Sequence, residues 1–225
     1  MPAHRRQLHD RFFKQAKAEG YLARSAYKLK EVQEKFRVLR HGSAVLDLGC
    51  APGSWLQVAS ELVGPRGIVV GIDLQTITAS FPPNVIAYTG DAFLTPPESL
   101  LAHLAPREAP AASSTPATPR RFDTVLSDMA PNTTGHGDEY HSERLCRRVL
   151  ELSPFVLAPN GSSVMKVLEG EPFPQLLADC KKLFRNAQAF KPQSSRDVSR
   201  EIFIVAQGYK LSTPTSSKPT APPKP

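Results

Sequence analysis

Hydrophobic and polar positions follow two alternating patterns along most of this chain. Short apolar runs predict buried strands, and between them apolar side chains recur every three or four positions, which predicts helices with one buried face. The predicted strands cover residues 44–48, 68–73, 85–88, 122–128, 162–168 and 201–206. The predicted helices among them cover residues 54–62, 145–157 and 173–184. Strands that alternate with helices predict an α/β fold, with a mostly parallel, doubly wound sheet that helices cover on both faces.

The N-terminal segment departs from this alternation. Residues 8–40 predict two helices with a break at Gly20, and Ser25 is the expected N-cap of the second helix. Residues 1–40 hold 11 Lys and Arg against 4 Asp and Glu, whereas residues 41–225 hold 17 of each, so the net charge of +7 lies entirely in this arm. An uncompensated basic arm favours contact with a polyanion such as a nucleic acid, although a solvated surface has the same composition.

The rest of the chain divides into one domain and two low-complexity segments. Residues 41–210 are long enough to form one domain, in which the Pro-, Ala- and Ser-rich residues 105–120 predict a disordered insertion. Residues 211–225 predict an unfolded tail. The three cysteines are widely spaced and odd in number, which argues against a disulfide framework and against a zinc site. Such cysteine usage is typical of a protein in a reducing compartment. No apolar stretch approaches the roughly 18 residues of a membrane span, and the N-terminus lacks the apolar segment of a secretion signal.

A glycine-bounded turn carries the first candidate for ligand binding. The apolar strand ends near Asp47, a turn between Gly49 and Gly53 follows, and a helix begins at Ser54. Glycine lets backbone N–H groups approach a ligand closely, and the helix N-terminus favours an anionic group. The spacing is Gly-x-x-x-Gly rather than the Gly-x-Gly-x-x-Gly of pyrophosphate-binding loops. An adenosine ligand without pyrophosphate therefore fits better, and S-adenosylmethionine is the candidate cofactor.

Acidic residues recur where the predicted strands end, at Asp47, Asp73, Asp91 and Asp128. The carboxyl ends of parallel strands meet at one edge of a sheet, where ligands bind, although a single acid there is equally well a helix cap. Asp73 lies 20 residues beyond Gly53, where a carboxylate can accept hydrogen bonds from both ribose hydroxyls. Lys166 lies inside an apolar strand, a costly place for a lysine unless it is paired or functional.

Several motifs, in this order, resemble the FtsJ/RrmJ family of RNA ribose 2′-O-methyltransferases. They are Arg24–Leu29, Asp47–Trp55, Ser127–Asn132, Val164–Val167 with Glu169–Glu171, and Lys191–Glu201. The resemblance covers about residues 10–210. It implies a Rossmann-like class I methyltransferase fold with a seven-stranded sheet, and S-adenosylmethionine as the cofactor. The insertion, the Pro-rich tail, and Ser54 where bacterial members usually carry glycine are departures from the family pattern.

The resemblance places the family's Lys-Asp-Lys-Glu tetrad on Lys28, Asp128, Lys166 and Glu201. A ribose 2′-OH is a very weak acid, so its attack on a sulfonium methyl group needs a base or a cation that stabilises the developing charge. Lysine ordinarily titrates near ~10.4. The sulfonium and Lys28 favour a neutral Lys166, able to act as general base, while Asp128 and Glu201 favour its cation. The sequence leaves both roles of Lys166 open.

The predicted cofactor site combines the glycine turn with the strand-end acids. Its expected residues are Gly49, Pro52, Gly53, Trp55, Asp73, Asp91 and Asp128. Trp55 packs either against the methionine part of the cofactor or in the core. His136 and His141 invite a metal site, but no third and fourth ligand follow at a usable spacing, so a loop near the substrate is expected and no metal.

The resemblance also implies a substrate. Ser127–Asn132 is similar to the branch that acts on large-subunit ribosomal RNA in bacteria or organelles, with a uridine of the peptidyl-transferase A-loop as the implied target. The residues expected to contact phosphate are Arg5, Arg6, Arg11, Lys14, Lys17, Arg24 and Lys30. We expect a monomer that binds ribosomal RNA or the large ribosomal subunit, in the cytoplasm of a bacterium or in a mitochondrion or other organelle of a eukaryote.

Three alternatives to this function remain at the level of sequence. The first is the tRNA anticodon-loop branch of the same family, whose members tend to carry Asp-Gly-Ala-Pro at the position of Asp128–Pro131. The second is a non-catalytic ribosome-assembly factor, which a degraded tetrad would favour. The third is a dehydrogenase, which lacks support because the Gly-x-Gly-x-x-Gly spacing is missing.

Overall fold

The computed structural model of the protein describes residues 3–104, 120–131, 137–195 and 199–210, with side chains from Arg11 onward. The predicted insertion, except Arg120, and the predicted tail at 211–225 lie outside the described residues. His136 lies outside them as well.

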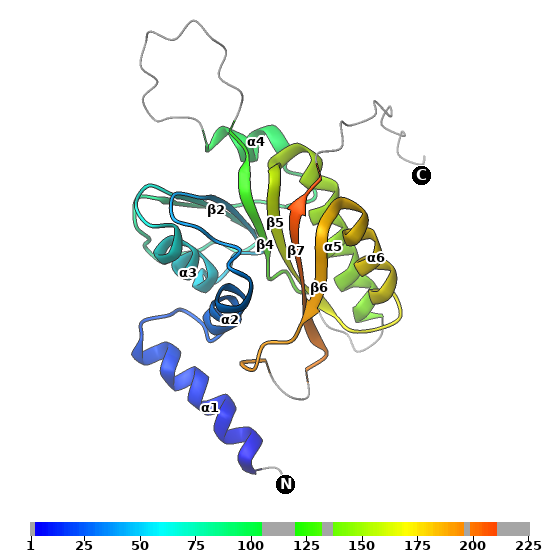
Figure 1. Cartoon of the computed structure of the whole chain (residues 1–225). Helices are drawn as coiled ribbons and strands as arrows, with labels where there is room; N and C mark the ends of the chain where they lie inside the picture. Colours follow the sequence, from blue (N-terminus) through cyan, green and yellow to red (C-terminus); the bar gives the residue numbers. More distant parts are fainter. Residues whose placement is uncertain (1–2, 105–119, 132–136, 196–198, 211–225) are drawn as a thin grey trace, which may run out of the picture.

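A seven-stranded sheet runs through the centre of the molecule in the order β3-β2-β1-β4-β5-β7-β6 (Figure 1). The strands are β1 (Ala44–Leu48), β2 (Ile68–Asp73), β3 (Val85–Thr89), β4 (Phe122–Ser127), β5 (Leu157–Leu168), β6 (Phe184–Phe190) and β7 (Glu201–Tyr209). Strands β1 to β5 are parallel, and β7 runs antiparallel to both β5 and β6. The mostly parallel, seven-stranded sheet is thus confirmed.

In the described part of the chain there are six helices, and all but the first lie against the two faces of this sheet. They are α1 (Ala3–Ala18), α2 (Ala26–Phe36), α3 (Ser54–Val63), α4 (Pro97–Ala102), α5 (Asp138–Val156) and α6 (Phe173–Leu183). Helices α2 and α3 pack on one face, and α4, α5 and α6 on the other, each with its own apolar core. All five residues of β1 are buried, as expected for a strand covered on both faces. No helix in the described part of the chain is long and apolar enough to cross a membrane.

The two N-terminal helices differ in how they attach to the domain. Leu29 and Val32 of α2 are completely buried in the same core as α3, whereas α1 projects from the body (Figure 1). Ser25 occupies the N-cap position of α2, as predicted, but its hydroxyl makes no capping hydrogen bond. It lies 2.8 Å from the hydroxyl of Ser54, the first residue of α3, because α2 and α3 pack side by side.

Two further differences from the predicted elements have local causes. Strand β6 was not predicted and begins at Phe184, the last residue of the expected helix. Only Phe184 and Ala187 among its seven residues are buried, so this edge strand lacks the alternation that marks a strand. Helix α5 begins at Asp138, well before the predicted start at residue 145. Its first turns are rich in charged residues, so the apolar periodicity used for the prediction begins later. Neither difference changes the order of the elements that form the site.

Candidate active site and cofactor cavity

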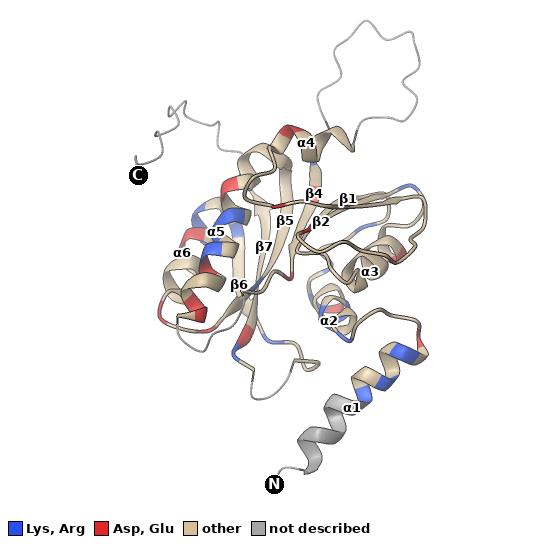
Figure 2. Cartoon of the chain, turned by 180° about the vertical axis from the view of Figure 1, so that it is seen from behind, with Lys and Arg blue, Asp and Glu red and all other residues tan. Residues whose placement is uncertain are grey.

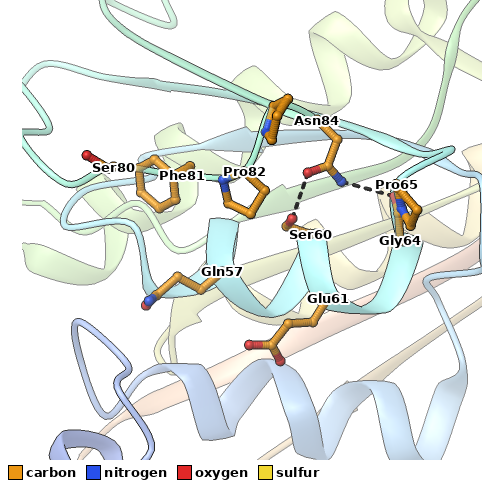
Figure 3. A pocket seen from close by; sticks show the side chains of 10 residues that line it. Gln57, Ser60, Glu61, Gly64, Pro65, Ser80, Phe81, Pro82 and Asn84 are labelled. Carbon is orange, nitrogen blue, oxygen red and sulfur yellow. Dashed lines mark hydrogen bonds between the residues drawn. The ribbon is translucent and has the colours of Figure 1, made fainter.

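A cavity of about 370 Å³ opens at the carboxyl ends of the parallel strands. Of the residues predicted to bind the cofactor, it is lined by Gly49, Asp73, Asp91 and Asp128. Lys166 lines the same cavity from β5. Four separate strand ends therefore contribute to one site, as the open parallel sheet requires. A larger cavity of about 520 Å³, between α3 and the segment before β3, contains none of the predicted site residues (Figure 3).

Gly49 shapes the floor of this cavity because no other residue fits its position. Its φ of +76° is in the left-handed region, and a Cβ atom there would lie 2.5 Å from Cγ of Met129 and 2.9 Å from the Met129 Cα atom. The second distance is to backbone, which cannot swing away. Glycine therefore brings the turn after β1 into direct contact with the segment after β4, and both line the cavity.

Asp73 links two backbone segments at the cavity wall. Its Oδ2 atom accepts a hydrogen bond from the Ala51 N–H at 2.9 Å, and Oδ1 accepts one from the Gln75 N–H at 2.8 Å. A carboxylate offers about four acceptor sites, so each oxygen keeps capacity for a ribose hydroxyl. Asp91 is similar, with Oδ1 accepting from the Phe93 N–H at 2.8 Å. Both acids combine support of the loop with an unfilled acceptor site.

Pro52, Gly53 and Trp55, the other predicted cofactor residues, are not among the cavity-lining residues. Trp55 is only 2% exposed, and its indole N–H donates to the Ser25 carbonyl at 2.8 Å. Its ring centroid lies 5.8 Å from that of Phe203. This geometry is that of a core residue which holds α2 against the turn, so a direct contact of Trp55 with cofactor stays a prediction.

Asp47 is a buried acid that the sequence placed at a strand end but not among the site residues. It is completely buried, and neither carboxylate oxygen has a hydrogen-bond partner among the described residues. Burial, with the charges of Asp128 and Asp73 added to it, raises the pKa of Asp47 well above its ordinary value. A carboxyl in an otherwise apolar strand was the sequence signal that marks this position.

The four tetrad residues form two lysine–carboxylate pairs beside the cavity. Lys28 Nζ lies 2.8 Å from Glu201 Oε2, and Lys166 Nζ lies 2.9 Å from Asp128 Oδ1. Lys166 Nζ also donates to the Asp128 carbonyl at 2.6 Å. Lys28 and Lys166 are only 5% and 7% exposed, so each ammonium depends on its carboxylate for compensation.

The register of the β5–β7 ladder brings the two pairs together. Glu201 lies opposite Leu168, and Phe203 lies opposite Lys166. Because side chains alternate between the faces of a sheet, Lys166 and Glu201 share one face, two positions apart along the ladder. Lys28 reaches the same face from α2, with Nζ 5.9 Å from the centroid of the Phe203 ring.

The charges of the two lysines act together on Glu201. Partial burial raises the pKa of this carboxyl, but the adjacent Lys28 and the charge of Lys166 outweigh burial, so its pKa lies below the ordinary value. The Glu201 carboxylate is therefore ionised throughout the neutral range.

No group of three or more His, Cys, Asp and Glu in the described part of the chain could hold a metal ion. His141 is exposed at the start of α5, and its predicted neighbour in the loop, His136, is outside the described residues. The residues lining the cavity instead suit an organic cation. Three carboxylates at strand ends, with a glycine turn that lets backbone approach, match the ribose hydroxyls, amino group and sulfonium of S-adenosylmethionine.

Comparison with known proteins decides the family. The family model described as FtsJ-like methyltransferase matches residues 21–209, which include all four tetrad positions. The chain belongs to the FtsJ-like methyltransferase family. This membership confirms the predicted enzyme class and fold and, with the acidic cavity, the predicted cofactor S-adenosylmethionine.

Relatives in this family share most of the length of the chain. A protein of Desulforapulum autotrophicum named Ribosomal RNA large subunit methyltransferase E is 43% identical over 206 residues, which cover 91% of this chain and 94% of its own. One of the same name from Desulfatibacillum aliphaticivorans is 42% identical over 203 residues, or 89% of this chain and 91% of its own.

Two solved structures have similar folds. A Plasmodium falciparum protein described as a ribosomal RNA methyltransferase has a TM-score of 0.68 at 25% identity, covering 84% of this chain and 98% of that one. Aeropyrum pernix fibrillarin with natively bound S-adenosyl-L-methionine has a TM-score of 0.52 at 19% identity, covering 81% of this chain and 73% of that one, and shows the fold alone.

Proposed function

We propose that this FtsJ-like methyltransferase transfers a methyl group from S-adenosylmethionine to a ribose 2′-OH of large-subunit ribosomal RNA, on a uridine of the A-loop. The observation that carries the proposal is the Lys166–Asp128 contact at the wall of the cofactor cavity, with the Lys28–Glu201 pair on the same face of the sheet. The relatives named Ribosomal RNA large subunit methyltransferase E, at 42–43% identity over about nine-tenths of the chain, support the choice of RNA.

We infer that Lys166, the tetrad lysine that lines the cavity, contacts the acceptor hydroxyl. S-adenosylmethionine supplies an electrophilic methyl group when bound, so the protein must position the 2′-oxygen and manage its proton. Lys166 Nζ lines the cavity, and one of its N–H bonds donates to the Asp128 carbonyl. A lysine ammonium has three N–H donors. With one directed at the Asp128 carbonyl and one at the Asp128 carboxylate, a third remains for the 2′-oxygen. A neutral Lys166 amine would instead offer a lone pair that accepts the proton of the 2′-OH.

Asp128, Lys28 and Glu201 position Lys166 and balance its charge. Asp128 holds the Lys166 side chain through both its carboxylate and its carbonyl oxygen. The Lys28–Glu201 pair lies close enough to Lys166 for the charge of Lys166 to lower the pKa of Glu201. Fixing the acceptor oxygen in line with the methyl carbon and sulfur is expected to supply much of the rate enhancement.

We also propose that the enzyme acts as a monomer and without a metal ion. The tetrad supplies the cations that a metal would otherwise provide to stabilise a developing oxyanion. Full activity in the presence of a chelator, and a monomer mass in light scattering under assay conditions, are the expected results. Loss of activity on chelation that a divalent ion restores contradicts this part of the proposal.

The decisive experiment uses the purified protein with labelled S-adenosylmethionine. The acceptors are large ribosomal subunits from a strain that lacks the A-loop methylation and, in parallel, unmodified tRNA. We expect label on a single uridine of the large-subunit RNA, located by mapping alkali-resistant linkages. Label on the tRNA anticodon loop moves the enzyme to the other branch, and cofactor binding without transfer to either RNA favours the assembly-factor alternative.

A further inference from the structure

Helix α1 is held to the rest of the protein by one side of its surface. The Phe12 ring packs on Tyr27 of α2 with centroids 5.4 Å apart, and Ala16 is buried. The Tyr21 N–H donates to the Ala16 carbonyl at 2.8 Å, a hydrogen bond that joins the last turn of α1 to the linker between α1 and α2. Lys30 of α2 pairs with Glu19 at 3.4 Å. The orientation of α1 is therefore set by contacts.

The linker between α1 and α2 is in turn fixed to α3. Gln57 accepts a hydrogen bond from the Leu22 N–H at 2.9 Å and donates one to the Gly20 carbonyl at 3.0 Å. The Tyr21 hydroxyl donates to Glu61 at 2.7 Å. Gln57 and Glu61 lie along α3, the helix that follows the glycine turn (Figure 3). The arm is thus tied to the element that carries the cofactor turn.

Phe13 takes part in none of the contacts described above and is 60% exposed. Its flanking residues are basic: Arg11, Lys14 and Lys17 are all exposed, and residues 11–18 contain no carboxylate. Lys17 follows Phe13 by four positions and therefore lies beside it on the helix surface. Figure 2 shows these basic residues on the described part of α1. A single exposed aromatic ring thus stands among three cations of residues 11–18, a segment bordered by the acids Asp10 and Glu19, of which Glu19 pairs with Lys30.

We propose that Phe13 is a stacking platform for one unpaired base of the RNA substrate, with Lys14 and Lys17 beside it to contact the flanking phosphates. The proposal rests on the proposed function and adds a base contact that the basic arm alone does not provide. Proteins that bind single-stranded nucleic acid combine aromatic rings, on which bases stack, with cations that follow the backbone. Both components lie on adjacent positions of α1.

The surroundings of Phe13 favour an RNA base over an apolar partner. A helix that docks into a protein groove or a membrane presents several apolar side chains at intervals of three and four. Within residues 11–18, Phe13 is the one large apolar side chain that is exposed. One aromatic ring near three cations matches an RNA base flanked by two phosphates. The same single ring would fill only a small part of an apolar groove on a partner protein.

The test compares RNA affinity and its salt dependence for matched variants of the full chain. The probes are a short unstructured oligoribonucleotide and a duplex of equal length. Phe13→Ala is expected to weaken binding of the single strand about 5- to 150-fold, the range for stacking of one base, without changing the salt slope. Lys17→Ala is expected to reduce that slope by about 0.7 for one lost phosphate contact. Phe155→Ala, a 46% exposed phenylalanine on α5 at the other face of the sheet, is the matched control.

Two further variants separate stacking from a purely apolar or structural role. Phe13→Trp is expected to retain affinity and to show fluorescence quenching by the oligoribonucleotide, because the one natural tryptophan, Trp55, is buried. Phe13→Leu is expected to bind as weakly as Phe13→Ala. Wild-type affinity of Phe13→Leu or Phe13→Ala overturns the proposal. Failure of the proposed function is seen separately, because the wild-type protein then transfers no methyl group to large-subunit ribosomal RNA, whatever the affinities of the Phe13 variants.

Discussion

The Nζ atom of Lys28 lies 2.8 Å from Oε2 of Glu201, although 173 positions separate the two residues. The contact ties α2 to the first residue of β7. Lys28 is almost completely buried, so removing its partner leaves a lysine with neither water nor a counter-charge. The pair therefore contributes to stability as well as to the site.

Glu201→Gln is expected to lower the free energy of unfolding at pH 7 by about 1–3 kcal/mol, less than for a fully buried pair because Glu201 is partly exposed. The pKa of Glu201 is lowered in the folded state, so its stabilisation is present above the pKa of the unfolded chain and is lost as pH falls through the folded value. Urea unfolding at pH 7 and near pH 3.5 checks this. The difference between variant and wild type should shrink at the lower pH, and a constant difference contradicts the role of the charge.

Lys166→Ala is expected to abolish methyl transfer while cofactor and RNA still bind. Lys166→Arg keeps a cation but cannot release a proton near neutral pH. We expect both variants to be inactive in single-turnover assays if Lys166 is the base. Residual activity of the arginine variant assigns it to orientation and charge stabilisation instead. Normal turnover by Lys166→Ala removes Lys166 from the site.

Asp73→Ala is expected to weaken S-adenosylmethionine binding at least 10-fold, equal to ~1.4 kcal/mol, because it removes charge-assisted acceptors and releases the Ala51 turn. Asp123→Ala is the matched control, since Asp123 Oδ2 also accepts a backbone N–H, from Ala44 at 2.8 Å, but lies at the opposite end of the sheet. Calorimetry should show reduced affinity for the first variant and normal affinity for the second. Equal affinities would show that Asp73 does not contact the ribose.

Gly49→Ala and Gly42→Ala separate backbone strain from close approach. Both glycines have positive φ values, +76° and +80°, so alanine strains each by a similar amount of roughly 1–2 kcal/mol. Only at Gly49 would the new Cβ also press on Met129, whereas nothing lies within 4 Å at Gly42. Thermal unfolding should show the larger loss for Gly49→Ala, accompanied by weaker cofactor binding. Equal losses would mean that the contact with Met129 relaxes freely.

The parallel strands could be predicted because strands buried on both faces consist of consecutive apolar residues. All five positions of β1 are apolar except Asp47, and each is buried between two layers of helices. Strand β6 has no such run of apolar residues. It lies at the edge of the sheet, and its place depends on pairing with β7, where Ala187 lies opposite Ala206. Pairing between distant segments has no local signal, so this strand was missed.

The candidate site divides in the same way. The strand-end acids and Lys166 stood out because polar residues in or beside apolar strands are costly, and the structure gathers Asp73, Asp91, Asp128 and Lys166 around one cavity. The position of Trp55 did not follow from its motif. The motif brings it to the glycine turn, but the packing of α2 and β7 decides that its ring faces Ser25 and Phe203.

By itself, the sequence determined the order of most strands and helices, the basic N-terminal arm and the glycine turn, because these properties depend on neighbours within a few positions. Only the tertiary structure decided that Lys28 pairs with Glu201 and Lys166 with Asp128, that Asp47 is left without a partner among the described residues, and that Phe13 rather than Phe12 faces solvent. Each of these depends on strand register and helix packing between distant segments, and the free energy of such contacts is set by the distance and burial that the fold imposes.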